Sequence, residues 1–201
     1  MTTKTARQRG RPRQFDPDEA VAKAQALFHA RGYDAVTVAD VTDALGITPP
    51  SFYAAFGSKA GLYARVLDRW AHTGAIPLAD LLRPDRDVAQ ALTDVLEDAA
   101  RRYAAQATGR GCLVLEGTRC QDRDAREAAC GFSRAAEGVI HDYIAARHPA
   151  MARQVTDFMV MTMSGLSAAA RSGHGVEQLL ASARLAGSAL ALAIPAERGD
   201  R

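Results

Sequence analysis

The chain has 201 residues, of which 48% are hydrophobic and 24% charged, with a net charge of +2; this balance is typical of a folded globular protein and excludes a disordered one. No run approaches the roughly 18 unbroken apolar residues of a membrane-spanning helix, and no apolar segment follows the basic N-terminal residues as in a secretory signal. The cysteines, Cys112, Cys120 and Cys130, are odd in number and too sparse for a disulfide scaffold, so we expect a cytoplasmic protein.

The first residues of the chain form a strongly basic segment. They carry five basic side chains and no acidic one, namely Lys4, Arg7, Arg9, Arg11 and Arg13. We expect a basic, flexible arm over residues 1–15, which on a nearly neutral body indicates a polyanionic partner. A solvated tail without a partner is the alternative interpretation.

Helix starts and ends follow one another closely after this arm. An N-cap residue precedes each of four apolar segments, and these caps are Asp16, Thr37, Thr48 and Ser58. Glycines suited to end a helix follow three of the segments, at Gly32, Gly46 and Gly57. The signals predict helices over about 17–31, from Thr37 to Gly46, from Thr48 to Phe56 and from Ser58 to about Trp70.

Longer helices are expected in the remainder of the chain, with no segment that alternates as a strand does. They cover about 86–106, 123–146, 150–171 and 176–194, with a short apolar segment at Cys112–Leu115. The predicted fold class is all-α, with about nine helices.

The segment from Thr37 to Phe56 has the features of a helix-turn-helix. Gly46 supplies the turn residue, Thr42 is the small residue one helical turn earlier, and Phe52 is an apolar residue that locks the two helices together. An ordinary pair of helices in a bundle is the alternative.

A resemblance to a known family becomes specific at this point. The residues GITPPSFYAAFGSKAGLYARVL, within the run from Arg9 to Trp70, resemble the N-terminal domain of TetR/AcrR-family transcriptional regulators. The motif positions are a glycine turn, a tyrosine in the recognition helix and a Phe-Gly-x-Lys sequence, here Gly46, Tyr53, Phe56, Gly57 and Lys59. Residues 110–117 (RGCLVLEG) and 165–173 (GLSAAARSG) resemble segments of the ligand domain and the dimerising helix of one branch.

The resemblance implies a fold and a function. It implies an N-terminal three-helix helix-turn-helix DNA-binding domain with a linking fourth helix over 16–70, followed by a larger helical ligand-binding and dimerisation domain over 71–201. The expected function is a homodimeric repressor that releases a pseudo-palindromic operator on double-stranded DNA when a small apolar or weakly polar effector binds. The residues expected to contact DNA are Arg9, Arg11, Arg13, Thr37, Thr48, Pro49, Pro50, Ser51, Tyr53 and Lys59.

The predicted recognition helix departs from the usual chemistry of base reading. It lacks Arg, Lys, Asn and Gln, the side chains that make bidentate contacts with guanine or adenine. We therefore expect phosphate contacts, thymine-methyl contacts and the arginine arm to dominate, with a steep dependence on salt. Core packing of Tyr53 and a solvated position for Lys59 are the alternatives.

Two further sets of residues follow from the resemblance, and ordinary core packing is the alternative for each. Large or adaptable side chains expected to line the effector pocket are Trp70, Tyr103, Cys112, Phe132, Phe158, Met159 and Met163. Residues expected at the dimer interface are Gly165, Ala169, Leu179, Ala183, Ala186 and Leu190.

Other functions have weaker support in the sequence. Cys112 follows Arg110 closely, so a thiol-based redox sensor of the same fold is one alternative, and a buried small hydrophobe is another. The five histidines form no metal-binding pattern, and no nucleophile or dinucleotide motif is complete, so we expect neither an enzyme nor a cofactor. A helical scaffold or membrane-surface protein is the alternative from a different class.

Overall fold

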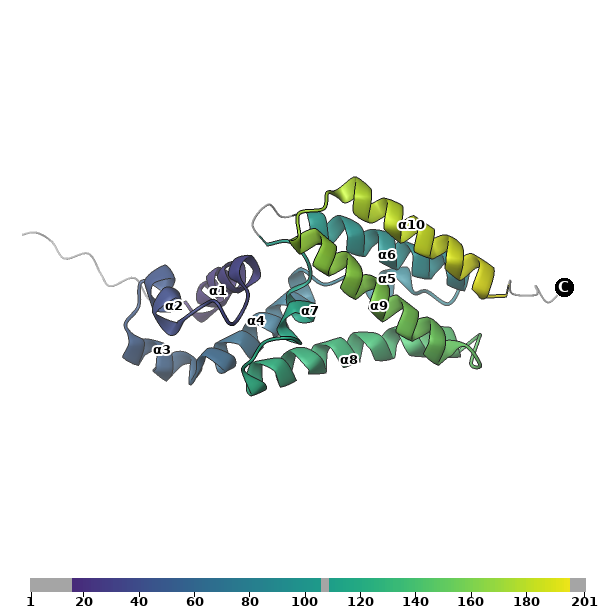
Figure 1. Ribbon diagram of the computed structural model, residues 1–201. Coiled ribbons are helices and arrows are strands. Elements are labelled where there is room, and N and C mark those ends of the chain that lie inside the picture. The colour runs from purple at the N-terminus through teal and green to yellow at the C-terminus, as the bar shows by residue number, and fades with distance from the viewer. Residues whose placement is uncertain (1–15, 106–108, 196–201) are drawn as a thin grey trace, which may run out of the picture.

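The computed structural model describes residues 16–105 and 109–195, and all regular elements within these ranges are α-helices (Figure 1). They are α1 (Pro17–Arg31), α2 (Val38–Leu45), α3 (Pro49–Phe56), α4 (Lys59–Thr73), α5 (Leu78–Leu81), α6 (Val88–Ala104), α7 (Leu113–Gly117), α8 (Arg123–Ala145), α9 (Ala152–Arg171) and α10 (Val176–Ala193). The all-α prediction is confirmed. About nine helices were expected, and these ranges contain ten when the four-residue α5 is counted.

The helix-turn-helix forms where its local signals predict it. The Thr37 hydroxyl accepts a hydrogen bond from the Asp40 backbone N–H at 3.1 Å, and the Thr37 backbone N–H donates to Asp40 Oδ2 at 2.7 Å, which completes a capping box. Gly46 ends α2 in the left-handed region, with φ 67° and ψ 35°, where a side chain is strained. These contacts are local in sequence, so the sequence alone predicts them.

The first of two hydrophobic cores holds α1 to α4 together, and we call these four helices the head. Phe28, Phe52 and Leu62 are among its fully buried side chains. The same core also takes in residues from α7, the α7–α8 loop and the start of α8, among them Leu113 and Ala129. The packing therefore continues beyond residue 70, where the sequence signals for the DNA-binding domain end.

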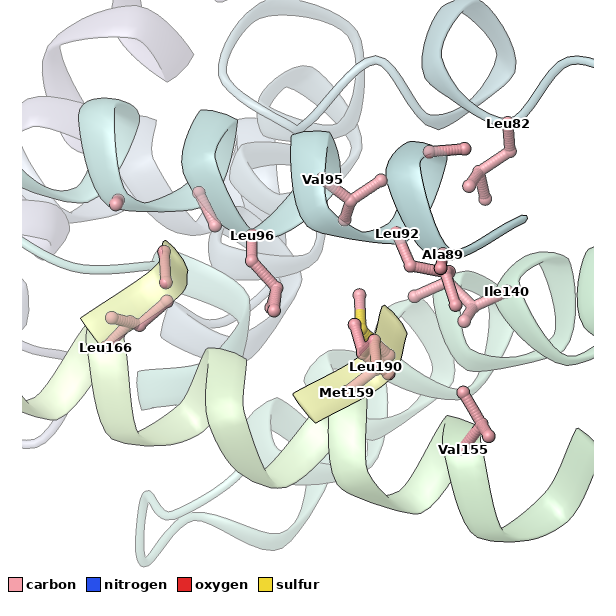
Figure 2. Close-up of a cluster of buried hydrophobic side chains, with 14 of the residues drawn as sticks. Leu82, Ala89, Leu92, Val95, Leu96, Ile140, Val155, Met159, Leu166 and Leu190 are labelled. Atoms are coloured by element: carbon pink, nitrogen blue, oxygen red, sulfur yellow. The ribbon is translucent and has the colours of Figure 1, made fainter. Parts of the chain in front are cut away.

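The second core lies among the remaining helices, and we call α5 to α10 the body. α6 packs against both α9 and α10, and α9 also packs against α8. Figure 2 shows side chains of α6, including Leu92 and Leu96, directed toward Met159 of α9 and Leu190 of α10. Burial of aliphatic surface of this kind is the main source of stability in a helical domain.

α4 connects the head and the body. Its first residues follow α3, and its last turn ends at Gly74, beside the body. Along its length it packs against α1, α7 and α8. Figure 1 shows α2 and α3 at one end of the molecule, and α10 extending toward the other.

Candidate nucleic-acid interface and effector cavity

The helix α3 presents one face to solvent and anchors the other in the head. Phe52 is fully buried, whereas the neighbouring Tyr53 is 52% exposed. Thr48, Pro49, Pro50 and Ser51 are also exposed. The predicted recognition residues on α3 thus lie on an accessible surface, and the alternative of core packing does not apply to Tyr53.

The N-terminal turn of α3 borders a shallow hollow. The Thr48 hydroxyl caps the helix by accepting from the Ser51 backbone N–H at 3.4 Å. The hollow is lined by Gly46, Ile47, Thr48, Ser51, Ala54 and Ala55, which include no charged side chain. A surface of methyl groups and hydroxyls of this kind suits thymine methyl groups and phosphate oxygens rather than a bidentate contact with guanine.

Thr37 lies at the exposed start of α2, and its polar groups are already engaged. Its hydroxyl donates to Asp40 Oδ2 at 2.5 Å, and Asp40 also pairs with Arg31 at 2.8 Å. The hydrogen bonds from Arg31 and then from Thr37 hold the pKa of the Asp40 carboxyl well below its ordinary value. Thr37 therefore fixes the start of α2 and also lies on the surface expected to face phosphate.

The ammonium group of Lys59 is half-buried and makes contacts within the head, so the solvated position that was the alternative does not apply, and its contact with phosphate stays a prediction. It donates to the backbone oxygens of Tyr33 at 3.1 Å and Val36 at 2.9 Å. It also lies 4.0 Å from the centre of the Tyr33 ring, in a cation–π contact. Its main role in this geometry is to tie the start of α4 to the loop between α1 and α2. Arg9, Arg11 and Arg13 lie outside the described residues.

A mostly apolar cavity of about 310 Å³ lies where α4 and α6 to α9 meet. Of the residues predicted for it, the structure places five in the wall, namely Trp70, Tyr103, Cys112, Phe132 and Met163. The other two are not in the wall, because Met159 is fully buried in the core of the body and Phe158 packs against that core.

Sequence reasoning missed the polar part of the cavity wall. Ser133 and Glu137 both face it from α8, and the Ser133 hydroxyl donates to Glu137 Oε1 at 3.2 Å. Their spacing of four residues places them on one side of a helix, but nothing local indicates that this side borders a cavity. Small residues at the end of α4, such as Ala71 and Gly74, complete the wall.

The environment of Cys112 is that of a resting thiol. Burial raises the pKa of the Cys112 thiol above its ordinary value, and burial likewise raises the pKa of the neighbouring Tyr103 hydroxyl. An activated cysteine needs a lowered pKa. The structure thus gives no support to the redox-sensor alternative.

The residues predicted for the dimer interface divide into two groups. Leu179, Ala183 and Leu190 are buried in the core of the body, on the side of α10 that packs against α6. A second copy cannot reach these three side chains, which corrects the prediction for them. Ala169 and Ala186 are half-buried against the same core, whereas Gly165 is exposed.

The outer faces of α9 and α10 carry large apolar side chains that the sequence analysis did not select. Leu185 and Leu192 of α10 are 74% and 90% exposed, and Met161 of α9 is 67% exposed. Leu185 and Leu192 are seven residues apart and so lie on one side of the helix. We call Met161, Gly165, Leu185 and Leu192 the outer apolar face.

Comparison with known proteins identifies the family. The family described as "Bacterial regulatory proteins, tetR family" matches residues 20–66. BdcR, an HTH-type transcriptional repressor of Escherichia coli (strain K12), is 56% identical over 190 residues, which cover 94% of this chain and 96% of BdcR. The chain belongs to the TetR family of bacterial regulatory proteins. This is the family that the motif residues from Gly46 to Lys59 indicate.

Further relatives of this TetR-family regulator agree in sequence and in fold. ComR, another HTH-type transcriptional repressor of the same E. coli strain, is 30% identical and is matched over 91% of its length by 92% of this chain. A cysteine mutant of the TetR family transcriptional regulator CifR, in complex with 26-bp double-strand operator DNA, superimposes with a TM-score of 0.80. It is 28% identical, and the match covers 89% of this chain and 99% of that one.

In residues 16–105 and 109–195, no three His, Cys, Asp or Glu side chains are grouped so that they could hold a metal ion. Within the same ranges, no helix of this TetR-family regulator is both long and apolar enough to cross a membrane.

Proposed function

We propose that this TetR-family regulator is a ligand-responsive repressor that binds a pseudo-palindromic operator as a homodimer and acts in the cytoplasm, where bacterial DNA lies. The observation that carries the proposal is the exposed α3 face beside the hollow at Gly46, anchored from behind by the buried Phe52. One head reads one half-site, so a two-fold dimer matches a palindromic site. In the proposed domain organisation, residues 1–15 form a basic arm, residues 16–70 bind DNA, and residues 71–201 bind the effector and form the dimer.

Operator binding and its dependence on salt test the proposal directly. Selection of bound duplexes from a random pool by the full chain is expected to return a palindromic site. Because phosphate contacts carry most of the affinity, gel-shift titration of that site should show about a 10³-fold weaker Kd at about 200 mM salt than at about 50 mM. Failure to enrich any palindrome, or a Kd that changes less than threefold, would contradict the proposal.

Uracil substitution tests the proposed readout by α3. The exposed Pro49, Pro50 and Ala54 offer methylene and methyl groups to the major groove, so we expect contacts with thymine methyl groups. Replacing thymine by deoxyuridine within a half-site should weaken binding about fourfold for each contacted methyl, the value for about 0.8 kcal/mol of apolar burial. The matched control places deoxyuridine outside the half-sites. Equal affinity for both duplexes is the result that excludes methyl readout.

The cavity favours a small, mainly apolar effector. Its volume of about 310 Å³ is at the lower end of the range for ligand pockets. Ser133 and Glu137 are its hydrogen-bonding groups on α8, so an effector with one polar end fits the wall better than a fully polar one. Binding that favours a different placement of the head would weaken operator affinity through the coupling between the two sites.

The outer apolar face is the proposed dimer surface. Large exposed apolar side chains that lie together mark interaction sites on soluble proteins. Leu185 and Leu192 project from α10, and Met161 from α9 lies near Gly165, whose missing side chain would allow close approach by a second copy. Gly165 thus keeps the role that the sequence analysis predicted for it.

A further inference from the structure

Besides the helix α4 and the hydrophobic core that it shares with α7 and α8, the head is joined to the body by two separate groups of polar contacts. One group lies beside the effector cavity and the other does not. The Arg171 junction consists of His29, Arg110, Gly111, Glu116, Ser167 and Arg171. The Asp122 junction consists of Tyr33, Asp34, Gln121 and Asp122.

Arg171, near the end of α9, makes three contacts in its junction. Its Nη1 donates to the backbone oxygen of His29 at 3.3 Å and to that of Arg110 at 3.1 Å. Its Nε lies 3.4 Å from Glu116 Oε2 of α7. His29 is in the last turn of α1, so one guanidinium group links the head to two segments of the body. Its planar, multidentate donor set suits this arrangement better than a lysine ammonium does.

His29 connects this junction with the cavity wall. The side chain is buried, and its Nε2 lies 3.0 Å from the backbone oxygen of Gly111. Its ring packs edge-on against Trp70, with ring centres 4.8 Å apart. Trp70 lines the cavity, so a ligand that moves its indole also moves the surface on which His29 rests.

The loop at Gly111 connects a second wall residue of the cavity, Cys112, with the Arg171 junction. Gly111 has φ +83°, and a Cβ added there would lie 2.9 Å from both Arg171 Cγ and Ser167 Oγ. The backbone N–H of Cys112 donates to Ser167 Oγ at 2.9 Å, and Cys112 lines the cavity. The loop is close-packed, so a displacement of Cys112 must also move Ser167 and Arg171, against which the loop packs.

Neither junction has a residue in the cavity wall itself. In the Arg171 junction, His29 and Ser167 contact the wall residues Trp70 and Cys112, whereas the hydrogen bonds of the Asp122 junction reach no wall residue. The Tyr33 hydroxyl donates to Asp122 Oδ2 at 2.7 Å, and the Gln121 backbone N–H donates to Asp34 Oδ2 at 3.0 Å. The Asp122 junction therefore holds the head without touching the site where an effector binds.

We infer that Arg171 is a positioning residue that couples occupancy of the cavity to the placement of the head, whereas the Asp122 junction only attaches the head. The inference rests on the proposed function, because it concerns the coupling between effector and operator. A ligand that displaces Trp70 or Cys112 changes the packing of His29 against Trp70 and of the Gly111 loop against Ser167. Arg171, which binds the backbone of His29, transmits this change to the end of α1. Such coupling is reciprocal, so operator binding weakens the ligand by the same factor.

The test uses the full-length protein, the selected operator and the neutral dye N-phenyl-1-naphthylamine as the cavity probe. Trp70 is the single tryptophan of the chain and lines the cavity, so energy transfer from Trp70 to the dye reports a dye molecule bound near the cavity. The operator Kd is measured with and without saturating dye for the wild type, Arg171→Met, Arg171→Lys and Tyr33→Phe. The quantity compared is the ratio of the two Kd values, since a purely structural effect of a substitution changes both alike.

The dye is expected to weaken operator binding about tenfold in the wild type and in Tyr33→Phe. In Arg171→Met the ratio should fall below twofold, with the dye-free operator Kd within about threefold of wild type. Arg171→Lys keeps the charge and decides the question if the methionine variant unfolds, as judged by circular dichroism; its ratio should also fall below threefold.

The outcomes separate the inference from the function on which it rests. A wild-type ratio near tenfold that persists in both Arg171 variants overturns the inference alone. A ratio that Tyr33→Phe abolishes as fully as Arg171→Lys overturns the distinction between the junctions. Absence of a selectable operator contradicts the proposed function, and dye binding at Trp70 with a wild-type ratio of one overturns the effector coupling and the inference with it.

Discussion

Replacing Phe52 with alanine is expected to lower the free energy of unfolding by about 3–5 kcal/mol, because it removes a fully buried ring from the core of the head. The neighbouring Tyr53 is 52% exposed, so Tyr53→Ala should change the free energy of unfolding by less than about 0.5 kcal/mol. The two substitutions truncate adjacent aromatic residues of the same helix. Urea unfolding followed by circular dichroism measures both.

Operator affinity should respond to the tyrosine even though stability does not. Tyr53→Ala removes a hydroxyl and a ring from the face proposed to enter the major groove, and we expect about a tenfold weaker operator Kd, or about 1.4 kcal/mol. A Tyr53→Ala protein with wild-type stability and wild-type affinity would contradict the proposed recognition surface. A stable Phe52→Ala protein would instead contradict the description of the head core.

Replacing Leu185 with glutamate is expected to weaken dimerisation by about 10²-fold or more, equivalent to about 3 kcal/mol, because a charge would be buried without a partner in an apolar interface. In the single chain Leu185 is 74% exposed, so the fold of each protomer should be retained. Sedimentation equilibrium measures the association, and the operator Kd should weaken in parallel because one head reads only a half-site.

The matched control adds the same charge elsewhere on the body. Ala150 is exposed in the loop between α8 and α9, and Ala150→Glu should leave both the dimer and the operator Kd within about twofold of wild type. A Leu185→Glu protein that sediments as the wild type does would place the dimer surface elsewhere than on the outer apolar face.

Most of the fold was accessible from the sequence because its signals are local. The capping pair Thr37 and Asp40 and the left-handed turn at Gly46 lie within a few residues of one another, and the structure has both. The short helices α5 and α7 were not predicted as separate elements. Neither has a side-chain cap, and a helix of four or five residues shows no periodicity that distinguishes it from a loop.

The candidate sites were less accessible because they depend on which side of a helix faces which neighbour. α10 has leucines on two sides, so periodicity alone could not separate the buried Leu179 and Leu190 from the exposed Leu185 and Leu192. Met159 and Met163 of α9 pose the same problem, since only Met163 lines the cavity. The ammonium of Lys59 is engaged by backbone oxygens more than 20 residues away, which no local pattern reveals.

The length of α4 has a mechanical consequence for a two-headed protein. Its 15 residues span about 22 Å, from Lys59, which is fastened to the head, to Trp70 and Thr73 beside the cavity. A tilt of about 5° around the cavity end would swing the far end by about 2 Å. Two copies swinging in opposite directions would double that mismatch against half-sites spaced about 34 Å apart. A helix of this length, moving as one body, therefore converts an ångström-scale rearrangement around the cavity into a displacement of both heads relative to their half-sites.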